Sequence, residues 1–136
     1  MSILNDDSLF NGQYRGYWSS SIDENSRLRL NKGIFETTPL CRGESLWRYA
    51  DPAGKCFVLC PDPYRRAYID YSKAKFNDQE SEIIEKAERL LACGNAGRID
   101  SYGRIIIPGI CLSEATIKVP RHIQIFGNGL WFEVTK

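Results

Sequence analysis

The stretch Ile99-Asp100-Ser101-Tyr102-Gly103-Arg104 has a counterpart in Ile22-Asp23-Glu24-Asn25-Ser26-Arg27, 77 positions earlier (99 − 22 = 77). We call this displacement the repeat shift. Both copies pass directly into apolar residues, Leu28 after the first and Ile105 after the second. A short polar segment between apolar stretches indicates a strand, a tight turn and a second strand. The repeated pattern therefore predicts an internal duplication with one hairpin in each half.

The chemistry of each copy is that of a turn whose two ends are tied together. Asp23 and Asp100 stand at the first turn position, where a carboxylate accepts hydrogen bonds from backbone N–H groups two and three residues on. Gly103 supplies the positive φ that such turns commonly need. Ser26 stands in its place in the first copy, where a left-handed conformation costs about 1 kcal/mol unless Asn25 adopts it instead.

The arginine that closes each copy has two alternative roles. Arg27 and Arg104 either reach back to the aspartate of their own turn, as a purely structural pair, or present their planar donors outward to a phosphate or a guanine edge. The spacing leaves both open.

Composition limits the class of protein. The chain has 136 residues, of which 43% are hydrophobic, enough to bury a core in one domain or two very small ones. The formal net charge is +1, so affinity for nucleic acid requires local clustering of basic residues or repetition in an oligomer. No apolar run approaches the roughly 20 residues of a membrane span, and the start is polar, with Asp6 and Asp7. We expect a cytoplasmic protein without a membrane partner.

The cysteines and the single histidine carry little chemistry. Five cysteines without a Cys-x-x-Cys pair argue against a disulfide framework and a zinc ribbon. A metal pair at Cys56 and Cys60, or a catalytic dyad with His122, lacks the further ligands or orienting group it would need. No glycine-rich phosphate loop or paired acid and base is visible. We therefore expect no enzyme activity, no cofactor, no metal and no small-molecule substrate.

The pattern divides the chain into an N-terminal extension, residues 1–13, and two halves, residues 14–76 and 77–136. The expected elements of both halves are a mixture of strands and short helices, an α+β arrangement built twice. In the first half they are a hairpin of residues 14–22 and 28–30, a strand over 55–60, and a helix capped by Asp62 that ends near Phe76. In the second they are a helix capped by Asn77 and Glu80 that stops near Gly94, a strand over 105–107, a short helix within 108–115, and a hairpin of 122–126 and 130–134.

The order of these pieces resembles the MraZ family. Tyr14-Arg15-Gly16, followed by Ile22-Asp23-x-x-x-Arg27-Leu28, is similar to the family's opening, an aromatic-Arg-Gly stretch before a Leu-Asp-x-Lys-Gly-Arg-Leu turn. The segment from Asp100 to Pro108 resembles its second Asp-x-x-Gly-Arg element, and Phe57-Val58-Leu59-Cys60-Pro61 resembles the strand before its central helices. The resemblance covers nearly all of residues 14–134.

The resemblance implies two tandem swapped-hairpin AbrB-like (double-psi-like) β-barrel halves in one chain, with short helices between and after them. It also implies a ring-shaped homo-oligomer that regulates transcription, is associated with the nucleoid, and binds short direct repeats in double-stranded DNA upstream of a division and cell-wall operon. The DNA-binding residues that carry over are Arg27, Arg104 and, in the family's early position, Arg15.

The first copy departs from the family pattern. Asn25 and Ser26 replace the Lys and Gly of the family turn, and Asn31 replaces a Pro. We expect Arg29 and Lys32, close behind the turn, to replace the lost charge. We therefore expect specific recognition by the first turn to be altered or degraded in this chain.

A second hypothesis is an AbrB-like or antitoxin-like protein-binding module whose turn arginines are structural. Its interface would come from aromatic residues, although aromatics at helical spacing are more often core. The candidates are Trp47, Tyr49, Tyr64 and Tyr68.

Overall fold

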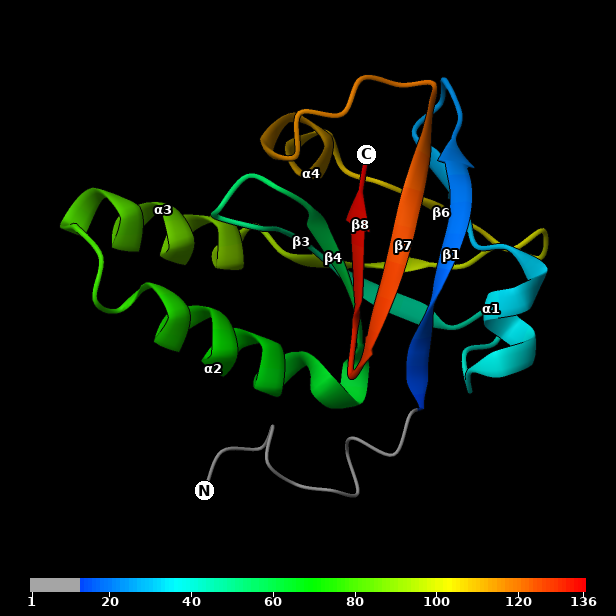
Figure 1. The fold of residues 1–136 in the computed structure, drawn as a ribbon, viewed down its shortest axis with the longest axis horizontal. Coiled ribbons are helices and arrows are strands. Elements are labelled where there is room, and N and C mark those ends of the chain that lie inside the picture. Colours follow the sequence, from blue (N-terminus) through cyan, green and yellow to red (C-terminus); the bar gives the residue numbers. More distant parts are fainter. Residues whose placement is uncertain (1–12) are drawn as a thin grey trace.

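The computed structural model describes residues 13–136, so the extension predicted over residues 1–13 lies outside the described residues except for Gln13. Within the described chain the fold is mixed α+β (Figure 1). The strands are β1 (Tyr14–Ile22), β2 (Arg27–Arg29), β3 (Ser45–Ala50), β4 (Phe57–Pro61), β5 (Asn95–Arg98), β6 (Arg104–Ile106), β7 (Arg121–Gly129) and β8 (Phe132–Thr135). The helices are α1 (Lys32–Thr37), the 3₁₀ turn η2 (Asp62–Tyr64), α2 (Arg65–Phe76), α3 (Ser81–Ala92) and α4 (Gly109–Glu114).

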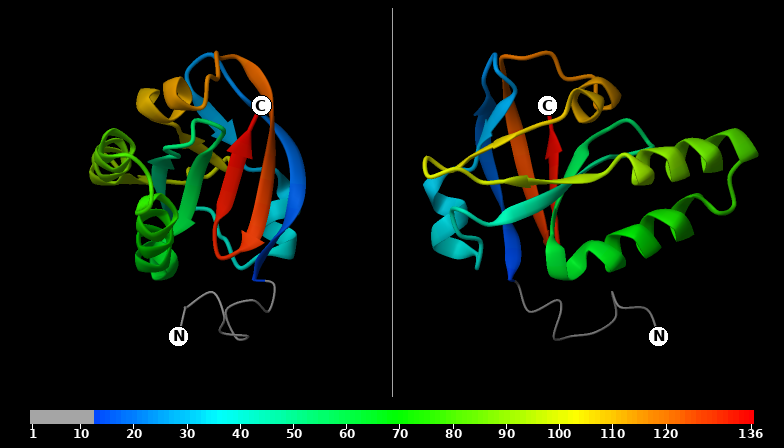
Figure 2. Two further views of the ribbon diagram at one scale, coloured as in Figure 1. Left: turned by 60° about the vertical axis from the view of Figure 1, so that its left-hand side comes forward. Right: turned by 180° about the vertical axis from the view of Figure 1, so that it is seen from behind.

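The eight strands form one antiparallel sheet in the order β5-β3-β4-β8-β7-β1-β2-β6. Its two edge strands, β5 and β6, are joined by the second Asp–Arg turn, where the Asp100 N–H donates to the Arg104 carbonyl at 2.8 Å. The sheet therefore curls into a nearly closed barrel (Figures 1 and 2). Pairs of neighbouring strands from residues 14–76 are interleaved with strands from residues 77–136, so both segments share one sheet.

The strand pairing has an internal symmetry that follows the sequence repeat. Trp18 pairs with Ile125 between β1 and β7, and Asn95 pairs with Arg48 between β5 and β3. The repeat shift converts the first pair into the second (18 + 77 = 95; 125 − 77 = 48). The pair of β2 and β6 is symmetric in itself. Its central cross-strand partners, Leu28 and Ile105, are equivalent residues of the two copies (105 − 28 = 77).

Two short helices obey the same relation. Helix α1 (Lys32–Thr37) and helix α4 (Gly109–Glu114) begin and end one repeat shift apart (109 − 32 = 77; 114 − 37 = 77). Asn31 caps α1 by accepting the Ile34 N–H at 3.3 Å, and Pro108 stands at the corresponding place before α4. Asn31 thus begins a helix where the second copy uses proline.

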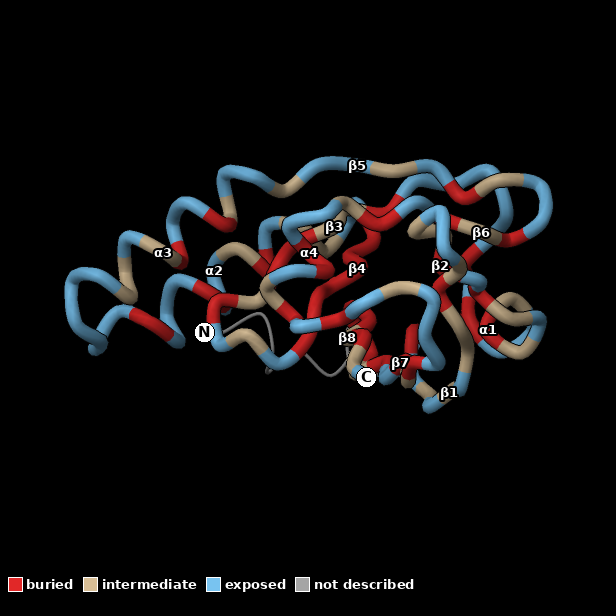
Figure 3. The backbone as a smooth tube through the Cα atoms, turned by 90° about the horizontal axis from the view of Figure 1, so that it is seen from above, coloured by how far each residue is buried: buried red, intermediate tan, exposed pale blue. Residues whose placement is uncertain are grey.

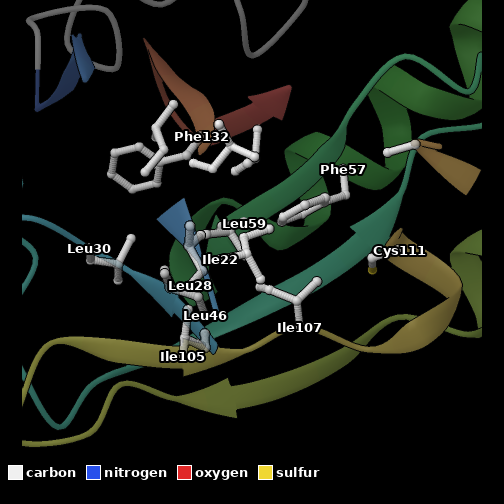
Figure 4. Packing of buried hydrophobic residues seen from close by; sticks show 14 of the residues in the cluster. Ile22, Leu28, Leu30, Leu46, Phe57, Leu59, Ile105, Ile107, Cys111 and Phe132 are labelled. Carbon is white, nitrogen blue, oxygen red and sulfur yellow. The ribbon is translucent and has the colours of Figure 1, made fainter. Parts of the chain in front are cut away.

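The barrel interior is filled by matched residues from both segments (Figure 4). Leu28 and Ile105 are 0% and 1% exposed, and Phe57 and Phe132 are both fully buried. Figure 3 shows this buried material along the strands, whereas the outer end of α3 is exposed. At about 25 cal/mol per Å² of apolar surface, burial of this kind is the main stabilising contribution.

Helices α2 and α3 pack against each other and extend together from one side of the barrel (Figure 1). Their capping differs from the prediction. The Asp62 carboxylate accepts the Trp47 indole N–H at 2.8 Å and does not cap α2, which follows a 3₁₀ turn. Asn77 ends α2, and α3 begins after Glu80 without a side-chain cap, so the expected capping box is wrong. At α2 the difference arises because the Asp62 side chain is used by Trp47 and a 3₁₀ turn leads into the helix.

A second cluster of aromatic residues lies between α2 and the outer side of β4. Tyr49 and Tyr68 are 1% and 2% exposed, and their ring centroids are 5.0 Å apart. Tyr68 also meets Trp131 edge to face at 5.2 Å. Tyr49 and Tyr68 therefore belong to the core and supply no exposed interface, while Trp47 and Tyr64 are half-buried.

Arg48 closes the seam of the barrel between β5 and β6. Its guanidinium donates to Asn95 Oδ1 at 2.6 Å, to the Ala96 carbonyl at 3.2 Å, and to the Ile106 carbonyl. The residue equivalent to Arg48 by the repeat shift is Ile125, which is fully buried. The two copies therefore differ at this position, because the first has the hydrogen-bond donors of Arg48 where the second has the apolar side chain of Ile125.

Candidate functional site

The Asp23 carboxylate holds the first turn together. Its Oδ1 accepts the backbone N–H groups of Asn25 at 2.9 Å and Arg27 at 3.0 Å, and its Oδ2 accepts Arg27 Nε at 2.8 Å. The Ser26 N–H donates to the Asp23 carbonyl at 3.0 Å. One side chain thus fixes the turn and the direction of its arginine.

The second turn repeats this geometry. Asp100 Oδ1 accepts the N–H groups of Tyr102 and Arg104, both at 2.9 Å, and Oδ2 accepts Arg104 Nε at 3.1 Å. The Gly103 N–H donates to the Asp100 carbonyl at 3.0 Å. The Arg104 guanidinium also lies 5.0 Å from the Tyr102 ring centroid.

Each turn contains one residue in the left-handed region. Gly103 has φ +79°, and Ser26 has φ +62° in the equivalent place. Ser26 itself, and not Asn25, therefore adopts the conformation that costs a non-glycine residue about 1–2 kcal/mol. The altered first turn keeps its shape at the expense of some backbone strain.

Hydrogen bonding fixes the charge state of both turns. The backbone N–H of Arg27 lowers the pKa of Asp23, and its guanidinium adds to that effect against a smaller opposing effect of burial. Arg104 lowers the pKa of Asp100 in the same way. Both carboxylates are ionised at neutral pH, so each Asp–Arg pair is neutral as a unit.

Each pair uses only the Nε of its arginine. No described residue accepts a hydrogen bond from the terminal nitrogens of Arg27 or Arg104, whose side chains are 34% and 25% exposed. A guanidinium has five N–H donors, so most remain for a partner. The structural pair and an outward-facing donor set are therefore compatible in one side chain.

The outer face of the β2–β6 pair gathers three arginines. Arg27 and Arg29 project outward from β2, and Arg104 and Ile106 from β6, with Ile106 60% exposed. Arg29 and Arg104 are direct cross-strand partners. We call Arg27, Arg29 and Arg104 the arginine ladder. Arg29 is the member of this ladder without an ion-pair partner among the described residues, so its charge and the unused terminal donors of Arg27 and Arg104 favour an anion over the face.

Two of the predicted residues lie apart from the ladder. Lys32 begins α1, where its exposed Nζ pairs with Glu36 at 3.4 Å. Arg15 pairs across the strand with Asn128, seven positions before Ile22 (22 − 15 = 7), or about 23 Å along β1 at 3.3 Å per residue. The structure therefore brings three of the five predicted arginine and lysine residues together and leaves Arg15 at the far end of the barrel.

Sequence reasoning missed Arg42 and Arg98, which lie beside the second turn. A signal was present for one of them. Arg98 directly precedes the Ile99-Asp100 pattern, where the first copy has Ser21. No sequence pattern marked Arg42, because its segment lies far from the second turn in sequence and is brought beside it only by the tertiary structure.

Other chemistries find little support among residues 13–136. No group of three or more His, Cys, Asp or Glu side chains that could hold a metal occurs there. Burial raises the pKa of Cys56, Cys60 and Cys111 to about 12, so these thiols are protonated at neutral pH. None of the helices in this part of the chain is long and apolar enough to cross a bilayer.

Neither the protein-family models nor the curated proteins contain a match to this chain. Its function is therefore argued from the residues and their geometry.

Proposed function

We propose that this chain is a sequence-specific DNA-binding transcriptional regulator of the MraZ type. In this proposal it acts as a ring-shaped homo-oligomer on short direct repeats upstream of a division and cell-wall operon, and is associated with the nucleoid. The observation that carries the proposal is the arginine ladder, in which Arg29 lies directly opposite Arg104 and has no ion-pair partner among the described residues, while Arg104 is paired with Asp100 through Nε alone. A DNA phosphate over this face would pair with the charge of Arg29 and engage the unused donors of Arg104.

The internal symmetry supports the tandem AbrB-like description. The repeat shift relates the strand pairs and the two short helices, as expected for two copies of one hairpin unit that exchange strands. A pseudo-twofold arrangement places one Asp–Arg turn at each end of the β2–β6 pair, where Ser26 bonds to Ile107 and Gly103 to Leu30. Two such turns give each subunit two points of contact with a duplex.

A ring makes good use of a chain with a net charge of only +1. Each subunit contributes a few phosphate or guanine contacts, and neighbouring subunits raise the effective concentration for the next repeat. We expect weak binding to a single repeat and a steep salt dependence for several.

The test is DNA binding as a function of salt. We would compare Arg27→Ala, Arg29→Ala and Arg104→Ala on a duplex with tandem repeats from the protein's own upstream region. Each variant should bind the duplex more weakly. The slope of the logarithm of the binding constant against the logarithm of the salt concentration should fall in magnitude by about one, as expected for the loss of one phosphate contact. Arg66→Ala is the matched control, because Arg66 lies on α2 with an 84% exposed side chain. Unchanged affinity and slope in all three ladder variants would reject the proposal.

A separate measurement addresses the ring. Sedimentation of the purified protein should show a discrete multi-subunit species that shifts on addition of this duplex. A monomer that ignores the duplex would instead favour the protein-binding alternative.

One observation favours that alternative, a protein-binding module with structural arginines. Tyr17 and Phe126 are 66% and 46% exposed and are direct cross-strand partners on the outer face of β1 and β7. The module would be supported if the wild-type protein binds no DNA but binds a partner protein. Arg104→Ala should then keep that partner, and Tyr17→Ser should lose it.

A further inference from the structure

A hollow of about 500 Å³ lies beside the second Asp–Arg turn. We call it the turn pocket. Two segments far apart in sequence form it, and they are held together by the Gly43 N–H on the Ile99 carbonyl at 2.9 Å and the Ile99 N–H on the Glu44 carbonyl at 2.8 Å. Its lining residues are Arg42, Gly43, Arg98, Ile99, Asp100 and Ser101.

The two arginines of the pocket are positioned against the protein. The Arg42 guanidinium lies 4.4 Å from the Phe35 ring centroid, and its Nε is 3.6 Å from where a Cβ of Gly103 would stand. Arg98 Nη2 lies 3.8 Å from the corresponding point on Gly43. A guanidinium stacked on a ring loses less conformational freedom when it binds a ligand.

The charges of the pocket are unbalanced. Neither Arg42 nor Arg98 forms an ion pair with any residue in the range 13–136. The one carboxylate of the lining, Asp100, already binds Arg104 at 3.1 Å. Glu44, the next acid along the chain, is not among the lining residues. Two guanidinium groups around an open hollow offer positive charge and planar pairs of N–H donors, which bind the oxygens of a phosphate in bidentate fashion.

The two arginines of the turn pocket are not repeated at the first turn. The residues equivalent to Arg98 and Arg42 by the repeat shift are Ser21 (98 − 77 = 21) and Val119 (42 + 77 = 119). The first turn also carries Glu24 beside its Asp23–Arg27 pair. The pair of Arg42 and Arg98 therefore belongs to the second turn, whereas the residue paired with Ile22 beside the first turn is Arg121.

We propose that the turn pocket binds a phosphate group, with Arg42 and Arg98 as its two guanidinium ligands. The group is a backbone phosphate of duplex DNA or the phosphate of a small ligand. Assignment to DNA rests on the function proposed above, whereas the phosphate site does not.

The first experiment uses inorganic phosphate as the probe. Titration of the full chain, followed by backbone amide NMR shifts, should move the signals of Gly43 and Ser101. Arg42→Gln and Arg98→Gln should each weaken phosphate binding about tenfold, as expected for loss of a charged hydrogen-bond donor. Arg98→Lys keeps the charge without the planar fork and should show an intermediate loss. Arg66→Gln, a surface change of the same kind on α2, should leave binding unchanged.

The second experiment separates the two sources of phosphate. On the tandem-repeat duplex, Arg42→Gln and Arg98→Gln should each lower the salt slope by about one if DNA supplies the phosphate. Lost phosphate binding with an unchanged duplex slope supports the pocket and assigns it to a small ligand. Phosphate binding that is absent in wild type, or equal in the Arg42, Arg98 and Arg66 variants, overturns the proposal, whatever the arginine ladder does with DNA.

Discussion

The two turns allow a reciprocal exchange of residues at their left-handed positions. Ser26 at φ +62° carries a strain of about 1–2 kcal/mol that glycine avoids, and glycine loses about 0.5–1 kcal/mol more on folding because its unfolded chain is freer. Ser26→Gly should therefore stabilise the protein by about 0.5–1 kcal/mol. Gly103→Ser should destabilise it by about 1–2 kcal/mol. The second effect is larger because its Cβ would lie 3.1 Å from both the Leu30 carbonyl oxygen and Phe35 Cε2.

Urea unfolding, with the slope of the transition checked for constancy, measures both changes. For a domain of this length, about 1 kcal/mol corresponds to a shift of about 3–4 °C in Tm. Ser101→Gly is the control, because Ser101 is not among the positive-φ residues and its replacement should destabilise by up to about 1 kcal/mol. If Ser26→Gly destabilises as much as Ser101→Gly does, the left-handed strain at Ser26 is not the relevant energy.

Two further predictions concern the core and the pH dependence of stability. Leu28→Ala, at the fully buried centre of the β2–β6 pair, should cost about 2–5 kcal/mol in urea unfolding, and Ile106→Ala, 60% exposed on the same strand pair, less than about 1 kcal/mol. A similar loss for both would mean that the pair is not packed as described. Burial, reinforced by Asp51, raises the pKa of Glu133, so its ionisation destabilises the folded state as the pH rises from its unfolded value of 4.5 through the raised value. Glu133→Gln should accordingly gain stability relative to wild type as the pH rises from 4.5 to neutrality; a pH-independent difference between the two proteins would contradict this.

Elements with strong local patterns could be predicted from the sequence. Helix α3 follows an apolar stripe, and the hairpin of β1 and β2 follows the Asp23 turn. Strands β3 and β5 and helix α1 were missed. Strand β5 (Asn95–Arg98) contains Gly97 and little β-forming sequence, and becomes a strand only by pairing with β3.

The repeat itself contained the information that was missed. By the repeat shift, α1 is the sequence equivalent of α4, and β3 is the equivalent of part of β7. Arg48 interrupts the apolar pattern of β3, and that arginine is explained only by the carbonyl groups it reaches across the barrel seam.

The chain's local chemistry could be predicted from the sequence, and its long-range arrangement could not. The Asp–Arg turns follow from the sequence, because every bond that forms them joins residues at most four positions apart. The meeting of Arg29 with Arg104, and of Arg42 with Arg98, depends on which strands pair when the barrel closes around its core. Such pairing is selected by the burial of apolar surface from the entire chain, which no short segment encodes.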